Sequence, residues 1–276
     1  MALIKLEGKT KLEGKTIFET GPAGYSIQDA NAASYIAAVE AADGASLEDP
    51  VKQAIDSFII GCKSDGIWTA LKASCILAGA RTLNGALVPL VGTAPTNNNF
   101  ISADYNRKSG LKGNASTKSL NTNRNNNLDP QNSKHIYTWL TERIPSTTVN
   151  GNRPIGTDSF SGSTFFSVGT GTPPVGLFHR VNSGSTLNIT PANANTGSHG
   201  LSRSSSANYT VISAGIIGTQ SAAATTPLNQ NIFVFGGANG NRVAARISFY
   251  STGEGLSLSN LHVRVSNLMT AINVAI

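Results

Sequence analysis

The distal part of the chain is a series of short stretches that suit β-strands, separated by loops rich in Gly, Asn, Ser and Pro. Many short strands at near-regular spacing are typical of a β-sandwich or jelly roll. The chain has 276 residues, enough for one large domain or two modest ones. Strands are predicted at residues 111–120, 134–143, 163–168, 175–182, 186–190, 198–203, 208–214, 230–236 and 242–251.

Helical patterns precede these strands. Ser26 and Asp29 resemble a capping box and predict a helix that ends at Gly44. Ser46 predicts the start of a second helix, and Gly66 marks its end. The next apolar stretch, "IWTALKASCILAG", is predicted to form a third helix with its tryptophan in the core.

A closing helix is predicted at the other end, capped near Ser257, with an apolar stripe of Leu258, Leu261, Val265, Leu268, Met269 and Ile272. The turn-forming stretch "GTAPTNNNF" at residues 92–100 predicts a domain boundary. The predicted fold is therefore mainly β. Its parts are an N-terminal β-strand arm (1–20), a small helical region for attachment and oligomerisation (21–99), and a jelly-roll sandwich with its closing helix (100–276).

The N-terminal residues contain Leu-Glu-Gly-Lys-Thr twice, in "KLEGKTKLEGKT". Gly-Lys-Thr ends a phosphate-binding loop, but that loop needs a glycine five positions ahead of the Gly-Lys pair, where this chain has Lys9. The even repeat instead predicts an extended strand with one apolar and one charged side. Leu6, Leu12 and Phe18 lie on the apolar side and are predicted to form an assembly arm that docks on a neighbouring subunit. The alternative is an ordinary strand of the chain's own domain.

Charge is distributed unevenly along the chain, whose formal net charge is +6. Residues 1–99 hold eight Lys/Arg against ten Asp/Glu, or −2, and residues 100–276 hold thirteen against five, or +8. A basic distal half indicates an acidic partner such as a nucleic acid, an anionic polysaccharide or lipid A phosphates. The basic residues are scattered singly without stacking aromatics between them, which disfavours nucleic acid.

The two cysteines, Cys62 and Cys75, lack metal-ligand spacing, so both are expected to be reduced and buried. No basic and then apolar stretch follows Met1, so we expect synthesis in a cytoplasm without classical export. The most apolar run is interrupted by Lys63 and Lys72, and no membrane insertion is expected.

Two stretches resemble a known family. "GLKGNASTKSLNTNRNNNLDPQNSKHIYTWLTE" resembles the opening of a laminin-G-like, concanavalin A-type jelly roll, with Trp139 at the position of the family's tryptophan. "ARISFYSTGEGLSLSNLHVRVSNLMTAI" resembles the family's ending, with residues 252–254 at the turn before a short helix. The helical section before them is similar to segments that precede such domains in tailed-bacteriophage virion proteins. The resemblance covers about residues 45–276 and implies this fold in a virion protein of tail-fibre or structural type.

Residues for catalysis are sparse. Glycan hydrolases need two carboxylates beside the scissile bond, and no two of the five in residues 100–276 are close in sequence (Asp104, Asp129, Glu142, Asp158 and Glu254). The histidines occur singly, and no Gly-x-Ser-x-Gly elbow is present. Calcium occurs in some laminin-G-like domains, for which Asp129 and Asp158 are weak candidates. We therefore predict no enzyme, no catalytic or metal-ligating residues and no cofactor.

An Asn-rich stretch is the candidate glycan-binding site, because amide side chains donate and accept hydrogen bonds as sugar hydroxyls do. Its candidate residues, with one tyrosine that could stack on a sugar ring, are Asn121, Asn123, Arg124, Asn126, Asn127 and Tyr209. The alternative is that these residues only support loop conformations.

The leading hypothesis is a non-enzymatic virion protein, a tail-fibre or adhesin subunit whose jelly roll faces host glycans. Its expected location is the virion, and it is expected to be a homotrimer. Its expected partners are other virion proteins and host cell-surface polysaccharide or lipopolysaccharide, with no nucleic acid. The alternatives are a capsid decoration (cement) protein and a glycan hydrolase.

Overall fold

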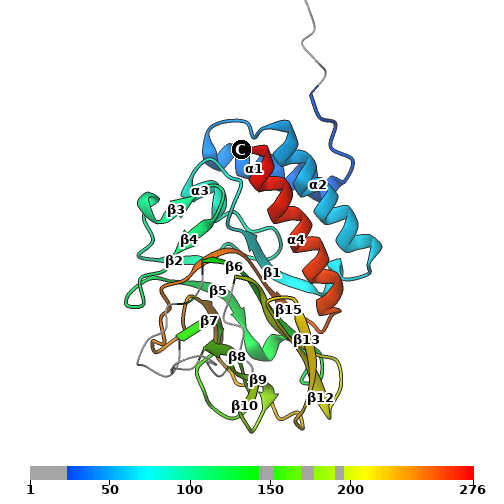
Figure 1. Ribbon diagram of the computed structural model, residues 1–276, viewed down its shortest axis with the longest axis vertical. Helices are drawn as coiled ribbons and strands as arrows, with labels where there is room; N and C mark the ends of the chain where they lie inside the picture. Colours follow the sequence, from blue (N-terminus) through cyan, green and yellow to red (C-terminus); the bar gives the residue numbers. More distant parts are fainter. Residues whose placement is uncertain (1–23, 143, 145–151, 169–176, 190–195) are drawn as a thin grey trace, which may run out of the picture.

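The computed structural model describes residues 24–142, 144, 152–168, 177–189 and 196–276. The predicted arm (1–20), with Leu6, Leu12 and Phe18, lies outside the described residues. Within them the fold is mainly β, with two antiparallel sheets that form a sandwich, a small helical region and a C-terminal helix (Figure 1). The predicted fold class is confirmed.

The larger sheet, here sheet A, has eight strands in the order β13-β12-β11-β6-β15-β4-β3, with β1 also paired to β15. These strands are β1 (Leu71–Ile76), β3 (Tyr105–Asn106), β4 (Gly110–Lys112), β6 (Lys134–Glu142), β11 (Gly197–Arg203), β12 (Asn208–Ser213), β13 (Ile216–Ser221) and β15 (Arg246–Gly253).

The second sheet, here sheet B, has seven strands in the order β10-β9-β8-β7-β14-β5-β2. These are β2 (Thr96–Asn98), β5 (Ser119–Asn125), β7 (Asn152–Gly156), β8 (Ser163–Val168), β9 (Leu177–Ser183), β10 (Leu187–Ile189) and β14 (Asn231–Val234). Alternate residues of both sheets point inward and form one hydrophobic core, to which Leu120, Phe166 and Leu201 contribute.

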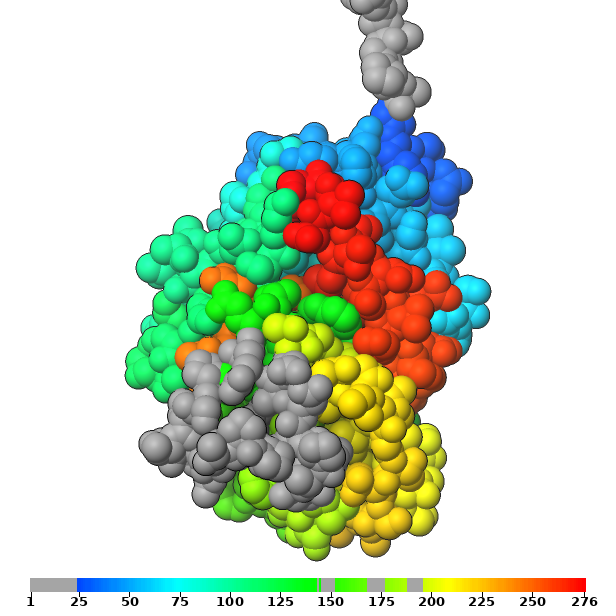
Figure 2. All heavy atoms as spheres, in the orientation of Figure 1, coloured from blue at the N-terminus to red at the C-terminus, as the bar shows by residue number. Residues whose placement is uncertain are grey.

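Helices cover the outer face of sheet A. The helices are α1 (Ala30–Asp43), α2 (Asp49–Ser64), the short α3 (Leu83–Ala86) and α4 (Leu258–Ala275), of which α1, α2 and α4 form this cover; 3-10 turns elsewhere are η1 (Trp68–Ala70), η2 (Ser102–Asp104) and η3 (Asn126–Leu128). A second hydrophobic core joins α1, α2 and α4 to sheet-A residues that include Tyr137, Ile212 and Phe249. The rings of Phe58 and Phe249 meet edge-on at 5.6 Å. In Figure 2 the blue helices and the red α4 adjoin at one end of the molecule.

The helix ends follow the sequence signals in part, because α1 is capped by Asp29 and not by Ser26, and the N-cap of α2 is Glu48 and not Ser46. Asp29 caps α1, where its Oδ1 accepts hydrogen bonds from the N–H groups of Asn31 and Ala32. Gly44, at φ 68°, ends this helix in the left-handed conformation. Ser257 caps α4, and the six predicted stripe residues of α4 are all buried.

The third predicted helix, over residues 67–79, is wrong. Residues 71–76 form β1, which pairs with β15 so that Cys75 lies opposite Tyr250. The stretch is apolar at nearly every position because the strand is buried on both faces, and such a run does not show a period. Since β1 belongs to sheet A and the helices share a core with that sheet, the predicted boundary at residues 92–100 does not separate two cores.

The predicted strands agree with the structure to different degrees. The prediction at 163–168 matches β8, whereas the single strand at 111–120 is two strands, β4 and β5, in different sheets. Besides β1, four strands were not predicted: β2, β3, β7 and β13. Trp139 is half-buried under α4, where it stacks on His262 at 5.8 Å, and does not lie between the sheets.

Candidate functional site

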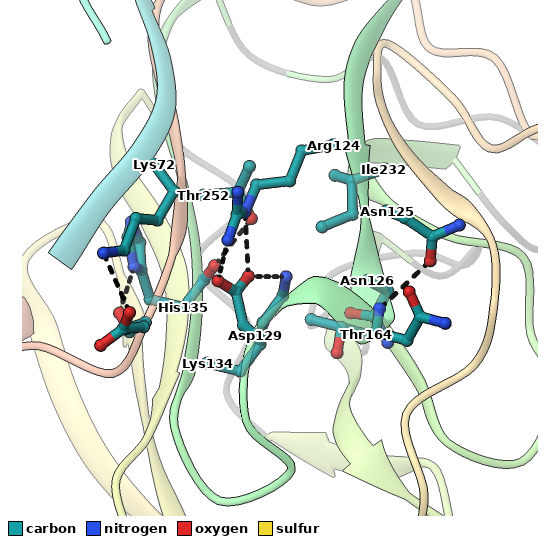
Figure 3. A network of polar contacts seen from close by, with 12 residues as sticks. Lys72, Arg124, Asn125, Asn126, Asp129, Lys134, His135, Thr164, Ile232 and Thr252 are labelled. Atoms are coloured by element: carbon teal, nitrogen blue, oxygen red, sulfur yellow. Dashed lines mark hydrogen bonds and ion pairs between the residues drawn. The ribbon is translucent and has the colours of Figure 1, made fainter. Parts of the chain in front are cut away.

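The Asn-rich stretch lies on β5 and on the segment that links β5 to β6. There, a buried ion cluster connects the two sheets, because Arg124 belongs to β5 and Lys134 to β6 (Figure 3). Arg124 and Lys134 both donate hydrogen bonds to the carboxylate of Asp129, with Arg124 Nε 3.2 Å from Asp129 Oδ2. The side chains of Lys134 and Asp129 are both 0% exposed, so the cluster is shielded from water.

Burial controls the protonation of this cluster. It lowers the pKa of Lys134 to about 8, although Asp129 opposes that shift. Burial also acts on Asp129, but the hydrogen bond from Arg124 and the charge of Lys134 outweigh it, so the pKa of Asp129 is lowered. The neighbouring His135 donates from Nδ1 to Glu254 O at 2.6 Å and bonds through Nε2 to Ser251 Oγ at 2.7 Å, and burial lowers its pKa to about 4. These groups hold the two sheets together and are not free to bind a ligand.

Three of the six candidate glycan-binding residues are engaged inside the protein. Arg124 belongs to the ion cluster. Asn126 is buried, and its amide donates hydrogen bonds to Gly162 O at 3.1 Å and to Asn182 Oδ1 at 3.0 Å. Tyr209 is 1% exposed and bonds through its hydroxyl to His179 Nδ1 at 2.8 Å.

The prediction that Tyr209 could stack on a sugar ring is therefore wrong. Tyr209 points to the same side of β12 as Val211, and both belong to the core between the sheets. The prediction that Asn126 offers its amide to a sugar is wrong for a similar reason, since that amide links η3 to the turn before β8 and to β9.

The other three candidates lie near the surface. Asn121 is half-buried, whereas Asn123 and Asn127 are exposed. Asn123 adopts φ 56° and donates from its amide to Ala94 O at 2.8 Å, which fixes the segment before β2. Asn127 donates its backbone N–H to Asn125 Oδ1.

Asn121 belongs to a row of residues that crosses the outer face of sheet B. Strand pairing sets the order of the row: Arg180 on β9 pairs with Phe165 on β8, Phe165 with Gly156 on β7, Gly156 with Phe233 on β14, Phe233 with Asn121 on β5, and Asn121 with Thr96 on β2. Phe165 and Phe233 belong to neither hydrophobic core, unlike Phe166, Ile232 and Val234 beside them. We call these six residues the outer row.

Three arginines contact the aromatic rings of the outer row. The guanidinium carbons of Arg153 and Arg180 lie 4.4 and 5.8 Å from the centre of the Phe165 ring, and that of Arg242 lies 6.0 Å from the centre of the Phe233 ring. These distances suit cation–π attraction.

The three arginines at the outer row are incompletely paired with carboxylates. Asp158 is 3.7 Å from Arg153, so this face has three arginines beside one carboxylate among the described residues. The buried Nε atoms of Arg153 and Arg180 have no hydrogen-bond partner in the part of the chain that the structure describes. Burial lowers the pKa of Arg153 to about 10, and burial also lowers the pKa values of Arg180 and Arg242. The result is a positive face whose charge is only partly neutralised.

Access to the outer row changes along its length. Phe165 and Arg180 are 3% and 8% exposed, and Gly156 is buried. Phe233, Arg242 and Asn121 are half-buried, and Thr96 is exposed. The β14–β5–β2 end of the row therefore offers an aromatic ring, an amide and a hydroxyl to a ligand, next to an arginine. Aromatic rings and amides of this kind suit sugar rings and their hydroxyls, and arginine suits carboxylate or phosphate groups.

The carboxylates of residues 100–276 are all paired. Asp104 lies beside Lys118, Asp129 in the ion cluster, Glu142 beside Lys112 and Arg246, Asp158 beside Arg153 and Glu254 beside Lys72. No group of three or more metal-ligating side chains lies within the described ranges. Asp129 and Asp158, the two candidate calcium ligands, have different partners, since Asp129 pairs with Lys134 and Asp158 bonds to Gln230. No helix among those ranges is long and apolar enough to cross a membrane.

Sequence reasoning found one member of the outer row, Asn121, and missed the two phenylalanines and the arginines over them. Those residues come from five strands and one loop, and only the pairing register brings them together. The signal that could have found them is alternation in β8 and β14, which places Phe165 and Phe233 at outward positions, opposite in direction to the core residues Phe166, Ile232 and Val234.

No protein-family model and no curated protein matches the sequence. Among solved structures, domain 4 of a GH43 extracellular arabinanase from Geobacillus stearothermophilus, in complex with arabinotriose, is 15% identical, with a TM-score of 0.41 over 66% of this chain and 82% of that one. A structure of botulinum neurotoxin type C, whose cell entry depends on interaction with two ganglioside molecules, is 11% identical, with a TM-score of 0.44 over 72% of this chain and 51% of that one. The enzymatically active domain of tailspike protein 2 from bacteriophage CBA120 is 12% identical, with a TM-score of 0.37 over 67% and 30%. This chain thus spans about half or less of the last two.

Proposed function

We propose that this chain is a non-enzymatic, glycan-binding virion protein, an adhesin subunit of tail-fibre type, and that the outer face of sheet B binds acidic polysaccharide or lipopolysaccharide of the host surface. The observation that carries the proposal is the outer row with its three arginines. Phe233 and Asn121 present a ring and an amide at an accessible position, and Arg242 lies over that ring.

Charge selects the class of glycan. The excess of arginine over carboxylate on this face favours sugars that carry carboxylate or phosphate groups. The +8 balance of residues 100–276 adds a long-range attraction for such polymers. Arginines 153 and 180 contribute mainly to this field, because both are nearly closed to solvent.

The pairing of the carboxylates supports the non-enzymatic part of the proposal. A glycan hydrolase needs one carboxyl group with a raised pKa as the acid and a second as nucleophile or base. Ion pairs with Lys118 and Arg124 help to lower the pKa values of Asp104 and Asp129, and pairing with Lys112 and Arg246 lowers that of Glu142. Each of these carboxyl groups is held in its charged form.

The test is binding of the full chain to purified acidic capsule or lipopolysaccharide, with uncharged dextran as the control. Binding should weaken strongly between 0.1 M and 1 M salt, because the screening length falls from about 10 Å to about 3 Å. No new reducing ends should appear during long incubation. Accumulation of reducing ends would replace the proposal by a hydrolase, and absence of binding at low salt would favour a capsid decoration protein. Equal affinity for single-stranded DNA would show that only charge is recognised.

A further inference from the structure

Strand β13 is the exposed edge of sheet A. It is six residues long, whereas the strands at the other ends of the two sheets have two (β3), three (β10) and three (β2). Proteins commonly keep edge strands short or guard them with charge, proline or a bulge, because an open edge pairs with other strands. Ile216–Ser221 contains no charged residue and no proline, and its pairing with β12 has no bulge.

The outer side of β13 is free to form hydrogen bonds. Ala214 and Gly215 form the two-residue turn between β12 and β13, with φ 47° and 84°. In such a hairpin the residues next to the turn exchange hydrogen bonds, so the N–H and C=O groups of Ile217, Thr219 and Ser221 point away from β12. Within the described ranges no residue pairs with this side of the strand.

An apolar surface lies next to this edge. Ile217 is 44% exposed and lies opposite Ile212, which belongs to the helix-side core. On α4, Val263 is 50% exposed, and the ring of His262 lies close to Gly215. Figure 2 shows the yellow β12–β13 hairpin beside the orange-red start of α4. A strand added to β13 could therefore bury alternate apolar side chains against Ile217 and Val263.

We propose that the N-terminal segment of a second copy of this chain adds to β13 as a further antiparallel or parallel strand of sheet A. This segment has the period that such a strand needs, with Leu6 and Leu12 on one side and lysines and glutamates on the other. Its charged side would face solvent and its apolar side would cover Ile217 and Val263.

The positions of the two elements suit a contact between two copies, although the chain's own N-terminal segment is also long enough to span α4. The described chain begins beside the first turn of α2, where Tyr25 N–H donates to Asp49 Oδ2 at 2.9 Å. That turn lies against the last turns of α4, because Pro50 and Gln53 line one groove with Val274 and Ala275. An 18-residue helix is about 27 Å long, and β13 lies at its other end. Donor and acceptor are thus at opposite ends of α4, which suits a head-to-tail contact that closes into a ring.

The experiment measures the mass of the full chain by light scattering. Thr219→Pro removes an outward N–H and blocks a new strand, but leaves the hydrogen bonds to β12 in place. Thr219→Val is the matched control that keeps the N–H. We expect an oligomer for the wild type and for Thr219→Val, and a single chain for Thr219→Pro with unchanged melting. A wild-type monomer, or an oligomer that survives Thr219→Pro in a folded protein, would overturn the proposal.

Thiol cross-linking identifies the donor. Cys62 and Cys75 are buried and burial raises their pKa values to about 12, so they react slowly with a bismaleimide. A mixture of Leu6→Cys and Thr219→Cys chains should give a cross-linked dimer, and a mixture of Lys5→Cys and Thr219→Cys chains should give less. A cross-link that forms only within the doubly substituted chain would show that β13 takes the chain's own segment, against the proposal.

Discussion

Both outer faces of the sandwich carry outward-pointing phenylalanines, but different groups cover these rings. On sheet A, Phe249 points outward and meets Phe58 of α2, so helices remove that face from water. On sheet B, Phe165 and Phe233 also point outward, but arginines contact their rings and no described helix covers them. The outward Phe249 of sheet A is therefore buried, whereas Phe233 of sheet B remains half-exposed. The residue type is the same on both faces, and what differs is the packing partner, a helix on sheet A and arginine side chains on sheet B.

The largest expected effect comes from the same substitution on each face. Phe249→Ala should lower the free energy of unfolding by about 3–5 kcal/mol, because it leaves a cavity between α2 and sheet A. Phe233→Ala should cost about 1 kcal/mol, because Phe233 is already half-exposed. Urea denaturation of both variants checks this. Equal losses would mean that the face of sheet B is packed as tightly as that of sheet A.

A smaller effect is expected at the ion cluster that joins the sheets. Asp129→Asn should cost about 3 kcal/mol, because Lys134 would keep a buried charge without its partner. The double variant Asp129→Asn with Lys134→Met should recover most of that loss. Unfolding of Asp129→Asn should remain one transition for both sheets. Two separate transitions would show that the two faces belong to independent units.

Acidification should lower the free energy of unfolding through one buried histidine in each sheet, with similar contributions from the two. Burial lowers the pKa values of His135 on β6 and His179 on β9 to about 4. Both therefore stay neutral in the folded protein while the unfolded chain takes up protons below its pKa of about 6.5. Stability should fall as pH decreases from 7.5 to 6, by about 1 kcal/mol for each histidine. In His179→Gln this fall should be smaller by about 1 kcal/mol, and an unchanged pH dependence would contradict the assignment.

The smallest expected effect is on ligand binding at the open end of the outer row. Arg242→Gln should weaken binding of acidic polysaccharide about tenfold, which corresponds to about 1.4 kcal/mol. Lys108→Gln removes the same charge near the end of α4, where Lys108 Nζ lies 3.4 Å from Asn273 O, and serves as the control. Equal weakening by both substitutions would indicate that overall charge, and not the face of sheet B, determines binding.

Local signals predicted some ends of helices and displaced others, since α1 and α2 begin three to four residues after the predicted starts at Ser26 and Ser46. Gly44 and Ser257 act where the sequence placed them, because caps and left-handed glycines depend on neighbouring residues. Residues 71–76 were predicted wrongly, since a strand covered on both faces has the composition of a buried helix. What makes this stretch a strand is its pairing with β15, which lies far away in the sequence.

The candidate site was less predictable than the fold. The Asn-rich stretch contains exposed Asn127 next to buried Asn126, and composition does not distinguish them. Tyr209 is a core residue because it lies on the same inward side of β12 as Val211, where its hydroxyl bonds to His179. The outer row depends on pairing among six strands, from β9 to β2, which no local pattern encodes.

Hydrogen–deuterium exchange of the full chain, with and without acidic polysaccharide at 0.1 M salt, tests the central claim most directly. If the outer face of sheet B binds the polysaccharide, exchange should slow in β5 and β14, at residues 119–125 and 231–234, and should not change in α4, at residues 258–275. Slower exchange in α4 or α2 alone, with β5 and β14 unchanged, would place recognition on the helical face and contradict the account.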